Sequence, residues 1–439
     1  MNSTMIASGM MLSNCTLNSK TVKDVLRTAH IGVGNMGLED LKAISSHASV
    51  EVIALCDVDS NYLKAAHALY PKAKVFVDYR VMLSELKNTI DAVIVSTPDH
   101  THAPASLEAM KLGKAVYCQK PLTHHVSEAR AMNEMAKSKN LVTQMGIQVH
   151  SFYDYKLATQ LIQAGCIGKV KTVHAWSPKN WGYDGPKYEG ADPIPDTLDW
   201  NLWLGTAPKR EYKEGVYHPG NWRKIIDYGC GTLGDMGVHI FDTPYNALAL
   251  DVPHTIRTDC RASTGFGFPE KNVVTYAFPG TKYTVQDFKW IWYDGDGAPN
   301  KHPDLKLPGD DVLPEQGAMF VGEKGNLLLP HFQVLPQLIV EDTYQELDMT
   351  ILKESERLVV PVRDYAAESP KHYHQFVDAC LGKDECTAPF SYAARLTETI
   401  LLGVIAGRFP NQTLHWNAEE GKFDEEEANA YLDGEYRVF

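Results

Sequence analysis

The chain has 439 residues, 44% of them hydrophobic, and its formal net charge of -13 comes from 42 basic and 55 acidic residues. This length allows two or three domains, each with its own core. The acidic balance argues against nucleic acid or an anionic membrane as a partner, because both favour basic surfaces. No apolar run reaches the length of a membrane span, so no transmembrane helix is expected.

Residues 1–26 are expected to form a tail ahead of the first domain. They carry no basic residue before Lys20, so they lack the basic start of a secretory signal. A cytoplasmic protein is therefore favoured, and a periplasmic one stays open if the tail is a trimmed export signal. The eight cysteines form no CxxC pair, which favours reduced thiols over disulfides or a metal site.

Residues 27–150 alternate short apolar runs with helix-like segments. The expected strands are Ala29–Val33, Val52–Cys56, Val75–Val77, Ala92–Ser96, Ala115–Cys118 and Leu141–Gln144. The expected helices are Met36–Ser45, Tyr62–Ala68, Val81–Leu86, Ala103–Leu112 and Val126–Lys137. Apolar strands with helices between them are typical of a parallel sheet covered on both faces. The pattern predicts a doubly wound α/β dinucleotide-binding domain of the Rossmann type.

Residues 151–439 are expected to form an α+β domain with a large, mostly antiparallel open sheet. Its expected elements are a helix, Tyr155–Ala164, and the strands Val170–Trp176, Thr255–Thr264, Val273–Ala277, Tyr283–Trp292, Gly317–Val321 and Asn326–Leu329. Helical periodicity over Ser369–Gly407 predicts helices that pack back on the first domain. An aromatic insertion, residues 177–222, interrupts the pattern. Its tryptophans argue against disorder, and a loop of that length is usually functional.

The stretch IGVGNMG places Gly32, Gly34 and Gly37 in G-x-G-x-x-G spacing between an expected strand and an expected helix. The three glycines allow a tight turn, a close approach of backbone to a pyrophosphate, and helix packing on the strand. The free N–H groups of the helix N-terminus favour the phosphates. Asn35 and Met36, inside the turn, are expected at the cofactor as well. The alternative is a tight turn without a ligand.

Asp57 ends the second expected strand, twenty residues after Gly37. A carboxylate there accepts hydrogen bonds from the adenosine ribose and repels a 2′-phosphate. The sequence therefore favours NAD over NADP. The alternative reading of Asp57 is a helix cap.

The stretch STPDHTHAP, residues 96–104, follows the fourth expected strand. Ligands of doubly wound sheets lie beyond the carboxyl ends of the strands, so Thr97, Pro98, His100 and His102 are expected near the cofactor. The alternatives for the two histidines are solvated loop positions and, less favoured, a metal site that would lack a third ligand.

The stretch VYCQKPLTHH ends the fifth expected strand with Gln119, Lys120 and Pro121. Lys120 lies at the same carboxyl edge, where its ammonium would reach a substrate oxygen beside the nicotinamide. An exposed lysine is the alternative, and Pro121 argues against it because proline fixes the backbone there. Gln119 and Lys120 are expected at the cofactor as well, and so is Gln148, which follows the sixth expected strand.

The stretch DYGCGTLGDMGVHIFD, residues 227–242, predicts a helix that begins near Leu233. Asp235 and His239 are then four residues apart on one helical face. A histidine beside a carboxylate is a common proton acceptor for an alcohol, with the carboxylate raising its basicity and fixing its orientation. An ordinary helix pair or a metal site stays open for this spacing.

Taken together, these motifs resemble the Gfo/Idh/MocA family of sugar and polyol oxidoreductases, over most of the chain from Thr28 onward. The resemblance implies hydride transfer between a sugar C–H and nicotinamide. It implies that Lys120 binds the reacting oxygen, His239 moves its proton, and Asp235 orients the substrate and His239. Most members have Glu-Lys-Pro where this chain has Gln119, which resembles a branch of bacterial putative dehydrogenases.

Substrate contacts are expected from the aromatic insertion and from the end of the first domain. Aromatic faces stack on sugar C–H surfaces, and arginine binds hydroxyl or carboxylate groups. The candidates are Tyr153, Trp181, His218, Trp222 and Arg223. The alternative is that these residues form a small aromatic core or a subunit contact.

Three functions are compatible with the sequence. The leading one is an NAD-dependent oxidoreductase acting on a sugar, sugar acid or glycoside. The second is a glycoside-cleaving enzyme that retains its NAD and acts through a transient keto-sugar. The third is a catalytically silent NAD-binding protein, against which the presence of lysine, aspartate and histidine together argues. A homo-oligomer, dimer or tetramer, is expected because an open antiparallel sheet face usually seeks a partner.

Overall fold

The computed structural model describes residues 24–309, 311–331, 334–348 and 365–439. Residues 1–23 of the predicted tail, residues 1–26, lie outside the described residues, and so does the possible export signal. None of the described helices is long and apolar enough to cross a bilayer.

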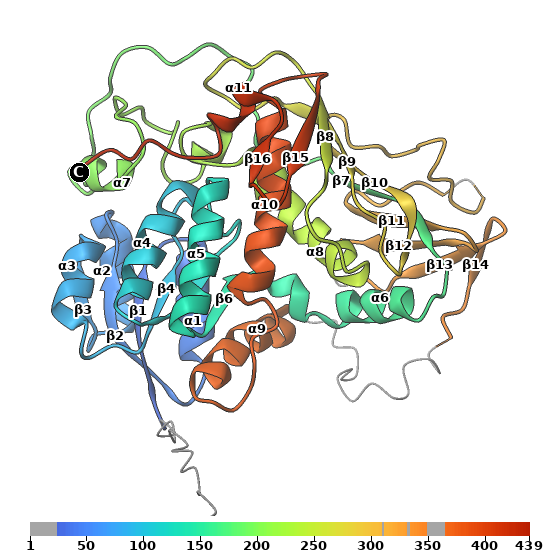
Figure 1. The fold of residues 1–439 in the computed structure, drawn as a ribbon. Helices are drawn as coiled ribbons and strands as arrows, with labels where there is room; N and C mark the ends of the chain where they lie inside the picture. Colours follow the sequence, from blue (N-terminus) through green and yellow to red (C-terminus); the bar gives the residue numbers. More distant parts are fainter. Residues whose placement is uncertain (1–23, 310, 332–333, 349–364) are drawn as a thin grey trace, which may run out of the picture.

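The first domain contains a six-stranded sheet in the order β3-β2-β1-β4-β5-β6, with every pair parallel. Its strands are β1 Leu26–Ile31, β2 Val50–Cys56, β3 Lys74–Phe76, β4 Ala92–Val95, β5 Ala115–Gln119 and β6 Thr143–Gly146. Its helices are α1 Met36–Ser45, α2 Ser60–Leu69, α3 Tyr79–Leu86, α4 Asp99–Lys111 and α5 Val126–Lys139. All of β4 is buried, as expected of a central parallel strand. The predicted Rossmann domain is confirmed (Figure 1).

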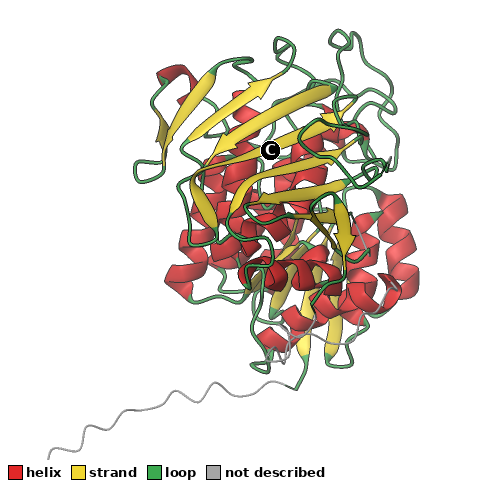
Figure 2. Cartoon of the chain, turned by 90° about the vertical axis from the view of Figure 1, so that its right-hand side faces the viewer, coloured by secondary structure: helices red, strands yellow, loops and turns green. Residues whose placement is uncertain are grey.

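The second domain contains a ten-stranded sheet in the order β14-β13-β12-β11-β7-β10-β9-β8-β15-β16. Its strands are β7 Val170–Ser177, β8 Thr255–Asp259, β9 Lys271–Ala277, β10 Thr284–Gly295, β11 Gly317–Gly322, β12 Asn326–Pro330, β13 Gln337–Val340, β14 Thr343–Gln345, β15 Thr413–Asn417 and β16 Lys422–Phe423. Neighbouring strands are antiparallel except β7 and β10, which are parallel. The antiparallel pair of β15 and β16 extends one edge of the sheet, next to β8. Figure 2 shows this sheet facing the viewer, with helices behind it. The predicted, mostly antiparallel second sheet is confirmed.

The remaining described α-helices are α6 Tyr153–Gln163, α7 Trp200–Leu204, α8 Val238–Ala247, α9 Tyr365–Cys380, α10 Phe390–Ala406 and α11 Glu426–Asn429. Helix α8 packs on β7 and β11 of the large sheet, α6 packs on β12, and α10 packs on β8. Short helical turns are η1 Gln148–Ser151, η2 Asn221–Lys224 and the π-helical η3 Leu233–Gly237. The apolar α10 runs between the domains (Figure 1) and contacts both α5 and α8. The helices predicted over Ser369–Gly407 are therefore present and pack on the first domain.

Several boundaries differ from those predicted. Helix α4 begins at Asp99 instead of Ala103, because Pro98 has the extended backbone of an N-cap. Strand β8 ends at Asp259 instead of Thr264, because Arg261 turns inward to the carbonyl groups of Gly267 and Phe268. The short strands β13 to β16 were not predicted, since they are two to five residues long and mostly half-exposed.

The aromatic insertion, residues 177–222, contributes to a second small core beside the first domain. This core contains Leu198, Trp200, Trp203, Leu204, Ala207, Tyr212, Tyr217, Trp222, Ile225, Tyr228 and Phe266. The insertion is tied to the end of β2 by two main-chain hydrogen bonds, Ser60 N–H to Thr197 O and Asp199 N–H to Val58 O. It therefore lies over the carboxyl edge of the parallel sheet.

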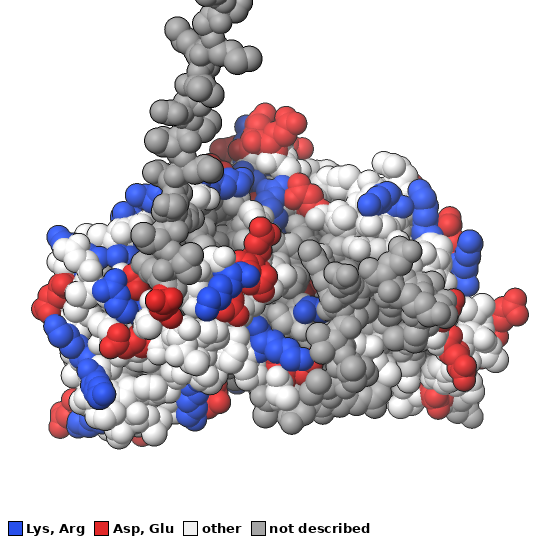
Figure 3. Space-filling view, turned by 90° about the horizontal axis from the view of Figure 1, so that it is seen from below, with Lys and Arg blue, Asp and Glu red and all other residues white. Residues whose placement is uncertain are grey.

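Among the described residues on the face seen in Figure 3, Lys and Arg side chains lie interspersed with Asp and Glu side chains.

Candidate active site

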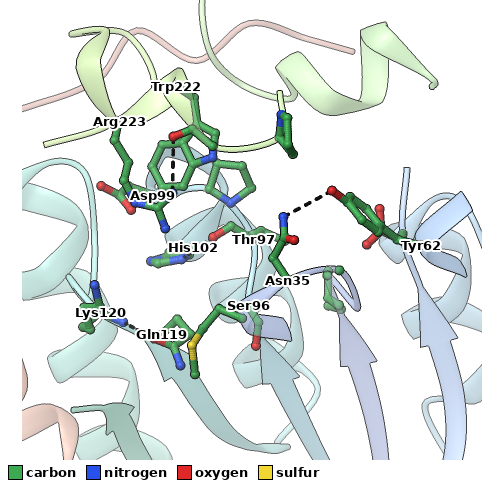
Figure 4. Close-up of a pocket in the computed structure, with 18 of the residues that line it drawn as sticks. Asn35, Tyr62, Ser96, Thr97, Asp99, His102, Gln119, Lys120, Trp222 and Arg223 are labelled. Atoms are coloured by element: carbon green, nitrogen blue, oxygen red, sulfur yellow. Dashed lines mark hydrogen bonds between the residues drawn. The ribbon is translucent and has the colours of Figure 1, made fainter. Parts of the chain in front are cut away.

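A cavity of about 600 Å³ lies at the carboxyl ends of the parallel strands, beneath the aromatic insertion. Its walls come from both domains, as Figure 4 shows for Lys120 and Gln119 below and Trp222 and Arg223 above. The predicted site residues that line it are Gly32, Gly34, Asn35, Met36, Asp57, Thr97, Pro98, His102, Gln119, Lys120, Gln148, His218, Trp222, Arg223 and His239. The predicted residues that do not line it are Gly37, His100, Tyr153, Trp181 and Asp235.

The glycine-rich turn has no room for side chains. A Cβ on Gly32, whose φ is +81°, would lie 2.5 Å from the carbonyl oxygen of Ser96. A Cβ on Gly37 would lie 2.2 Å from the carbonyl oxygen of Gly32, so Gly37 serves the packing of α1 on the turn. The turn leads directly into the N-terminus of α1 at Met36. This bare backbone before a helix N-terminus fits a pyrophosphate.

Asp57 stands at the end of β2 on the cavity wall. Its carboxylate accepts hydrogen bonds from the N–H groups of Val33, at 2.8 Å, and Asp59, at 2.9 Å. Burial raises the pKa of Asp57, and these two hydrogen bonds oppose the shift. The cap of α2 is Asp59, which accepts from Asn61 N–H, so the helix-cap reading does not apply to Asp57. The Asp57 carboxylate is thus held in one position on the cavity wall.

Lys120 and Asp235 form an ion pair between the two domains. Lys120 Nζ lies 2.8 Å from Asp235 Oδ1, and both side chains are more than four-fifths buried. Asp235 also accepts hydrogen bonds from Arg223 Nε, at 3.2 Å, and Trp181 Nε1, at 2.6 Å. Burial by itself would raise the pKa of Asp235, but the Lys120 and Arg223 cations hold it well below its usual value. Asp235 therefore stays ionised and holds Lys120 at the cavity.

His239 lines the cavity, but it is not paired with Asp235 as the sequence predicted. Asp235 lies in the π-helical turn η3, where four-residue spacing no longer aligns side chains as it does in an α-helix. Its carboxylate faces Lys120, Arg223 and Trp181, and within the described part of the chain no hydrogen bond joins it to His239. Asp235 thus orients Lys120, and the expected orientation of His239 by Asp235 is not observed.

The imidazole of His239 is buried and neutral. Burial lowers its pKa well below the usual range, the Lys120 ammonium adds to this effect, and Asp235 opposes it. Its Nδ1 is buried with no hydrogen-bond partner among the described residues. The lowered pKa keeps the ring neutral, which is the form of histidine that can accept a proton.

The two histidines of the TPDHTH loop have different places. His102 lines the cavity, with Nδ1 2.8 Å from Pro121 O and Nε2 2.7 Å from Thr97 O. His100 lies behind the wall, with its nitrogens near Trp203 O and Tyr228 O. Burial lowers the pKa of both rings to about 4. The expectation that His100 contacts the cofactor is not supported, because its polar atoms serve the aromatic insertion.

The predicted substrate residues divide between the two ends of the cavity. His218 binds Asp59 Oδ2 at 2.9 Å beside the ring of Tyr62, on the side of Asp57. Trp222 and Arg223 lie over the end near Lys120. Trp181 lies behind Asp235, and Tyr153 uses its N–H to bind Glu368. His218 is therefore at the Asp57 end of the cavity, because the insertion is anchored there at the end of β2.

Several cavity residues were not predicted from the sequence: Tyr62, Ser96, Asp99, Phe152, Met236 and His331. Asp99 stands within the TPDHTH motif beside Pro98, so the motif itself could have indicated it. Burial raises its pKa to about 7, against the nearby Arg223 and Lys120 cations. His331 follows β12, where no motif marks it. Within the described residues no group of three His, Cys, Asp or Glu side chains could hold a metal ion.

The model of the oxidoreductase family with an NAD-binding Rossmann fold matches residues 26–147, and that of its C-terminal α/β domain matches residues 156–308. The chain belongs to the Gfo/Idh/MocA family of oxidoreductases. The resemblance inferred from the motifs is thereby confirmed.

Named relatives act on polyols and sugars. An inositol 2-dehydrogenase from Salmonella typhimurium is 29% identical over 44% of this chain and 58% of its own length. A levoglucosan dehydrogenase from Pseudarthrobacter phenanthrenivorans is 27% identical over 35% of this chain and 32% of its own. The chain thus matches 58% of the length of the first relative and 32% of the length of the second.

A solved structure shows the same fold along nearly the whole described chain. An oxidoreductase domain protein from Kribbella flavida has a TM-score of 0.63 with 20% identity, covering 89% of this chain and 99% of that one. This similarity shows the fold alone.

Proposed function

We propose that this protein is an NAD-dependent dehydrogenase that transfers a hydride between a CH–OH carbon of a sugar, sugar acid or glycoside and nicotinamide. The observation that carries the proposal is one cavity that combines a glycine cradle with Lys120 and the neutral His239. The relatives named as inositol and levoglucosan dehydrogenases support the substrate class.

The bound dinucleotide would supply the hydride acceptor, held by the turn at Gly32 and Gly34 and by Asp57. Lys120 would donate a hydrogen bond to the substrate oxygen, and its charge would favour the alkoxide that forms as the proton leaves. His239 would accept that proton, since its ring is neutral. Asp235, saturated by three donors, would hold Lys120 in place instead of taking part in proton transfer.

NAD is preferred over NADP in this proposal because of Asp57. Its carboxylate lines the ribose side of the cavity and would repel a 2′-phosphate. A comparison of NADH and NADPH affinity for the wild type and for Asp57→Ala tests this step. A wild type that binds NADPH as tightly as NADH would contradict it. The homo-oligomer and the cytoplasmic location stay predictions, and light scattering tests the first.

The reaction is tested by following NADH absorbance with a panel of sugars, polyols and sugar acids. Lys120→Met and His239→Gln should each lower turnover of the best substrate by about a thousandfold, within the range of positioned acid–base and electrostatic groups. His174→Gln is the matched control, because His174 is a buried histidine of β7 outside the cavity that binds Tyr293 Oη. A protein that binds NADH but shows no reaction with any substrate would favour the silent NAD-binding function.

A second candidate function is redox-neutral glycoside cleavage with retained NAD, and Asp99 favours it. The dehydrogenase step has no use for this buried carboxyl group, whose pKa is raised to about 7 by burial. In cleavage, a sugar hydroxyl is oxidised, the C–H beside the new carbonyl loses its proton, and the glycosidic oxygen leaves with a proton from Asp99. Water then adds to the sugar and the ketone is reduced by the returned hydride.

Release of a chromogenic aglycone without added NAD, and without net NADH, would support this second function. Asp99→Asn should then lower cleavage by a hundredfold or more, as for other general acids. If Asp99→Asn cleaves like the wild type, Asp99 is not the acid.

A further inference from the structure

The amide at Gln119 has a partner that accounts for it, the buried carboxylate of Asp40. Asp40 lies on α1 and is completely buried. Gln119 Nε2 lies 2.9 Å from both Asp40 oxygens. Because a carboxylate only accepts, the –NH2 group of Gln119 must face it. This leaves Gln119 Oε1 to accept the N–H of Lys120, at 3.2 Å.

Asp40 also binds two further groups that lead to the cavity. Ser96 Oγ donates to Asp40 Oδ2 at 2.6 Å, and Tyr373 Oη donates to Oδ1 at 2.7 Å. Tyr373 in turn accepts a hydrogen bond from Gln148 Nε2 at 2.7 Å. Ser96, Gln119 and Gln148 all line the cavity, whereas Asp40 and Tyr373 lie behind it. One buried carboxylate thus connects three cavity side chains at the ends of three neighbouring strands.

We infer that Asp40 is a positioning residue for the cofactor end of the cavity, and that Gln119 and Asp40 form one charge-matched unit. The inference deepens the proposed function and rests on it for the identity of the cofactor. An anion at position 40 requires a neutral donor at position 119, because two carboxylates at this distance cannot both ionise. Asp40 carries the negative charge of the unit. Asp40 fixes the Gln119 amide, and the amide oxygen in turn holds the backbone N–H of Lys120.

Space around the pair supports a fixed geometry. A Cβ on Gly146 of β6 would lie 2.8 Å from the Gln119 amide, so the neighbouring strand closes against this side chain. Gln119 is 5% exposed. Burial raises the pKa of Asp40 to about 6, while its hydrogen bonds to Ser96, Tyr373 and Gln119 oppose the shift. The amide therefore has one orientation available, and Asp40 sets it.

A charge-swap experiment tests the unit. The variants are Gln119→Glu, Asp40→Asn and the double variant, and the readout is NADH affinity from tryptophan fluorescence between pH 6 and 8. Gln119→Glu should weaken binding roughly tenfold at pH 8 and less at pH 6, where one of the two carboxyls keeps a proton. Asp40→Asn should weaken it at both pH values. The NADH affinity of the double variant should return to within about threefold of the wild-type value. In that variant the amide of residue 40 donates to the carboxylate of residue 119, so the pair is restored with its roles exchanged.

The matched control is a second amide–carboxylate pair, the half-buried Asn272 and the buried Asp294, joined at 2.8 Å between β9 and β10 and outside the cavity. The corresponding changes Asn272→Asp and Asp294→Asn should lower the melting temperature without altering NADH affinity or its pH dependence. If Gln119→Glu binds NADH like the wild type at both pH values, or the double variant shows the sum of the single losses, the inference is overturned.

Failure of the proposed function has a different signature. If the wild type binds no NADH, the dehydrogenase proposal fails, and the melting temperature then tests the unit. Paired carboxyls have a raised pKa in the folded state, so their stability is present at low pH and lost as pH rises. Gln119→Glu should therefore lose stability from pH 6 to 8 relative to the wild type, and the double variant should not. Parallel pH curves for all three proteins would remove the inference.

Discussion

The Rossmann domain and the aromatic insertion both line the cavity, but their side chains are placed by different forces. In the parallel sheet, residues directly after a strand reach the carboxyl edge whatever lies elsewhere in the chain. Thr97 after β4 and Lys120 after β5 illustrate this. In the insertion, position depends on distant partners: His218 is held by Asp59, and Trp181 by Asp235. The local sequence pattern therefore predicts where side chains lie in the Rossmann domain. In the aromatic insertion it predicts only which residues could contact a ligand.

The largest effect expected on cofactor affinity comes from a substitution in the glycine-rich turn of the first region. Gly32→Ala forces a side chain into a backbone with φ of +81° and brings its Cβ to 2.5 Å from Ser96 O. Strain of a few kcal/mol at this turn should weaken NADH binding by roughly tenfold to a hundredfold. Equilibrium fluorescence titration with NADH measures the change.

Gly113→Ala is the control for the turn variant. Gly113 has a similar φ of +74°, but a Cβ there meets nothing within 4 Å, and the residue lies between α4 and β5. It should cost about 1 kcal/mol of stability and leave NADH affinity unchanged. Equal losses of affinity in both variants would mean that general destabilisation, and not the phosphate turn, weakens binding.

The difference between the regions also explains what the sequence could predict. Strand order, the parallel sheet and the cofactor turn follow from apolar runs and glycine spacing, which are local. The hydrogen-bond partners of Asp235 could not be predicted from its four-residue spacing to His239, because Asp235 lies in a π-helical turn and its carboxylate binds residues from distant segments. Gln119 looked unexplained because its partner, Asp40, is 79 residues away in the chain and has no motif of its own. Contacts between distant elements depend on packing that periodicity does not encode.

Substitution of Asp99 should have an effect of intermediate size, on the pH dependence of stability. Asp99 lies in the first region, and its pKa is set by burial and by the nearby cations of Arg223 and Lys120. Its folded-state pKa of about 7 lies above the usual carboxyl value, so its contribution to stability is present at low pH and is lost as pH rises toward 7. Between pH 5 and 6.5 the unfolding free energy of the wild type should therefore fall as pH rises, with Asp99 contributing up to about 1.4 kcal/mol per pH unit. Asp99→Asn should make this fall less steep by that amount. Urea unfolding at several pH values measures this slope.

The exposed carboxylate of Asp287 on β10 is the comparison for that experiment. Asp287→Asn removes a charge from the surface and should leave the slope as it is in the wild type. A slope that changes equally in both variants would show that net charge, and not the burial of Asp99, causes the effect.

The smallest effect is expected for His218→Ala, measured as the rate of NADH dissociation. This variant tests whether the aromatic insertion restrains the bound cofactor. The His218–Asp59 pair is the side-chain contact that fastens the insertion beside Asp57, with both side chains less than one-fifth exposed. His218→Ala should remove about 1 kcal/mol of this restraint, as for other partly exposed pairs, and NADH should dissociate about fivefold faster. Stopped-flow displacement of NADH measures the rate. His302→Ala, whose ring lies in the sheet domain 3.9 Å from Asp304, is the control and should not change it. An unaltered rate in His218→Ala would mean that the main-chain bonds of Ser60 and Asp199 hold the insertion closed without the histidine.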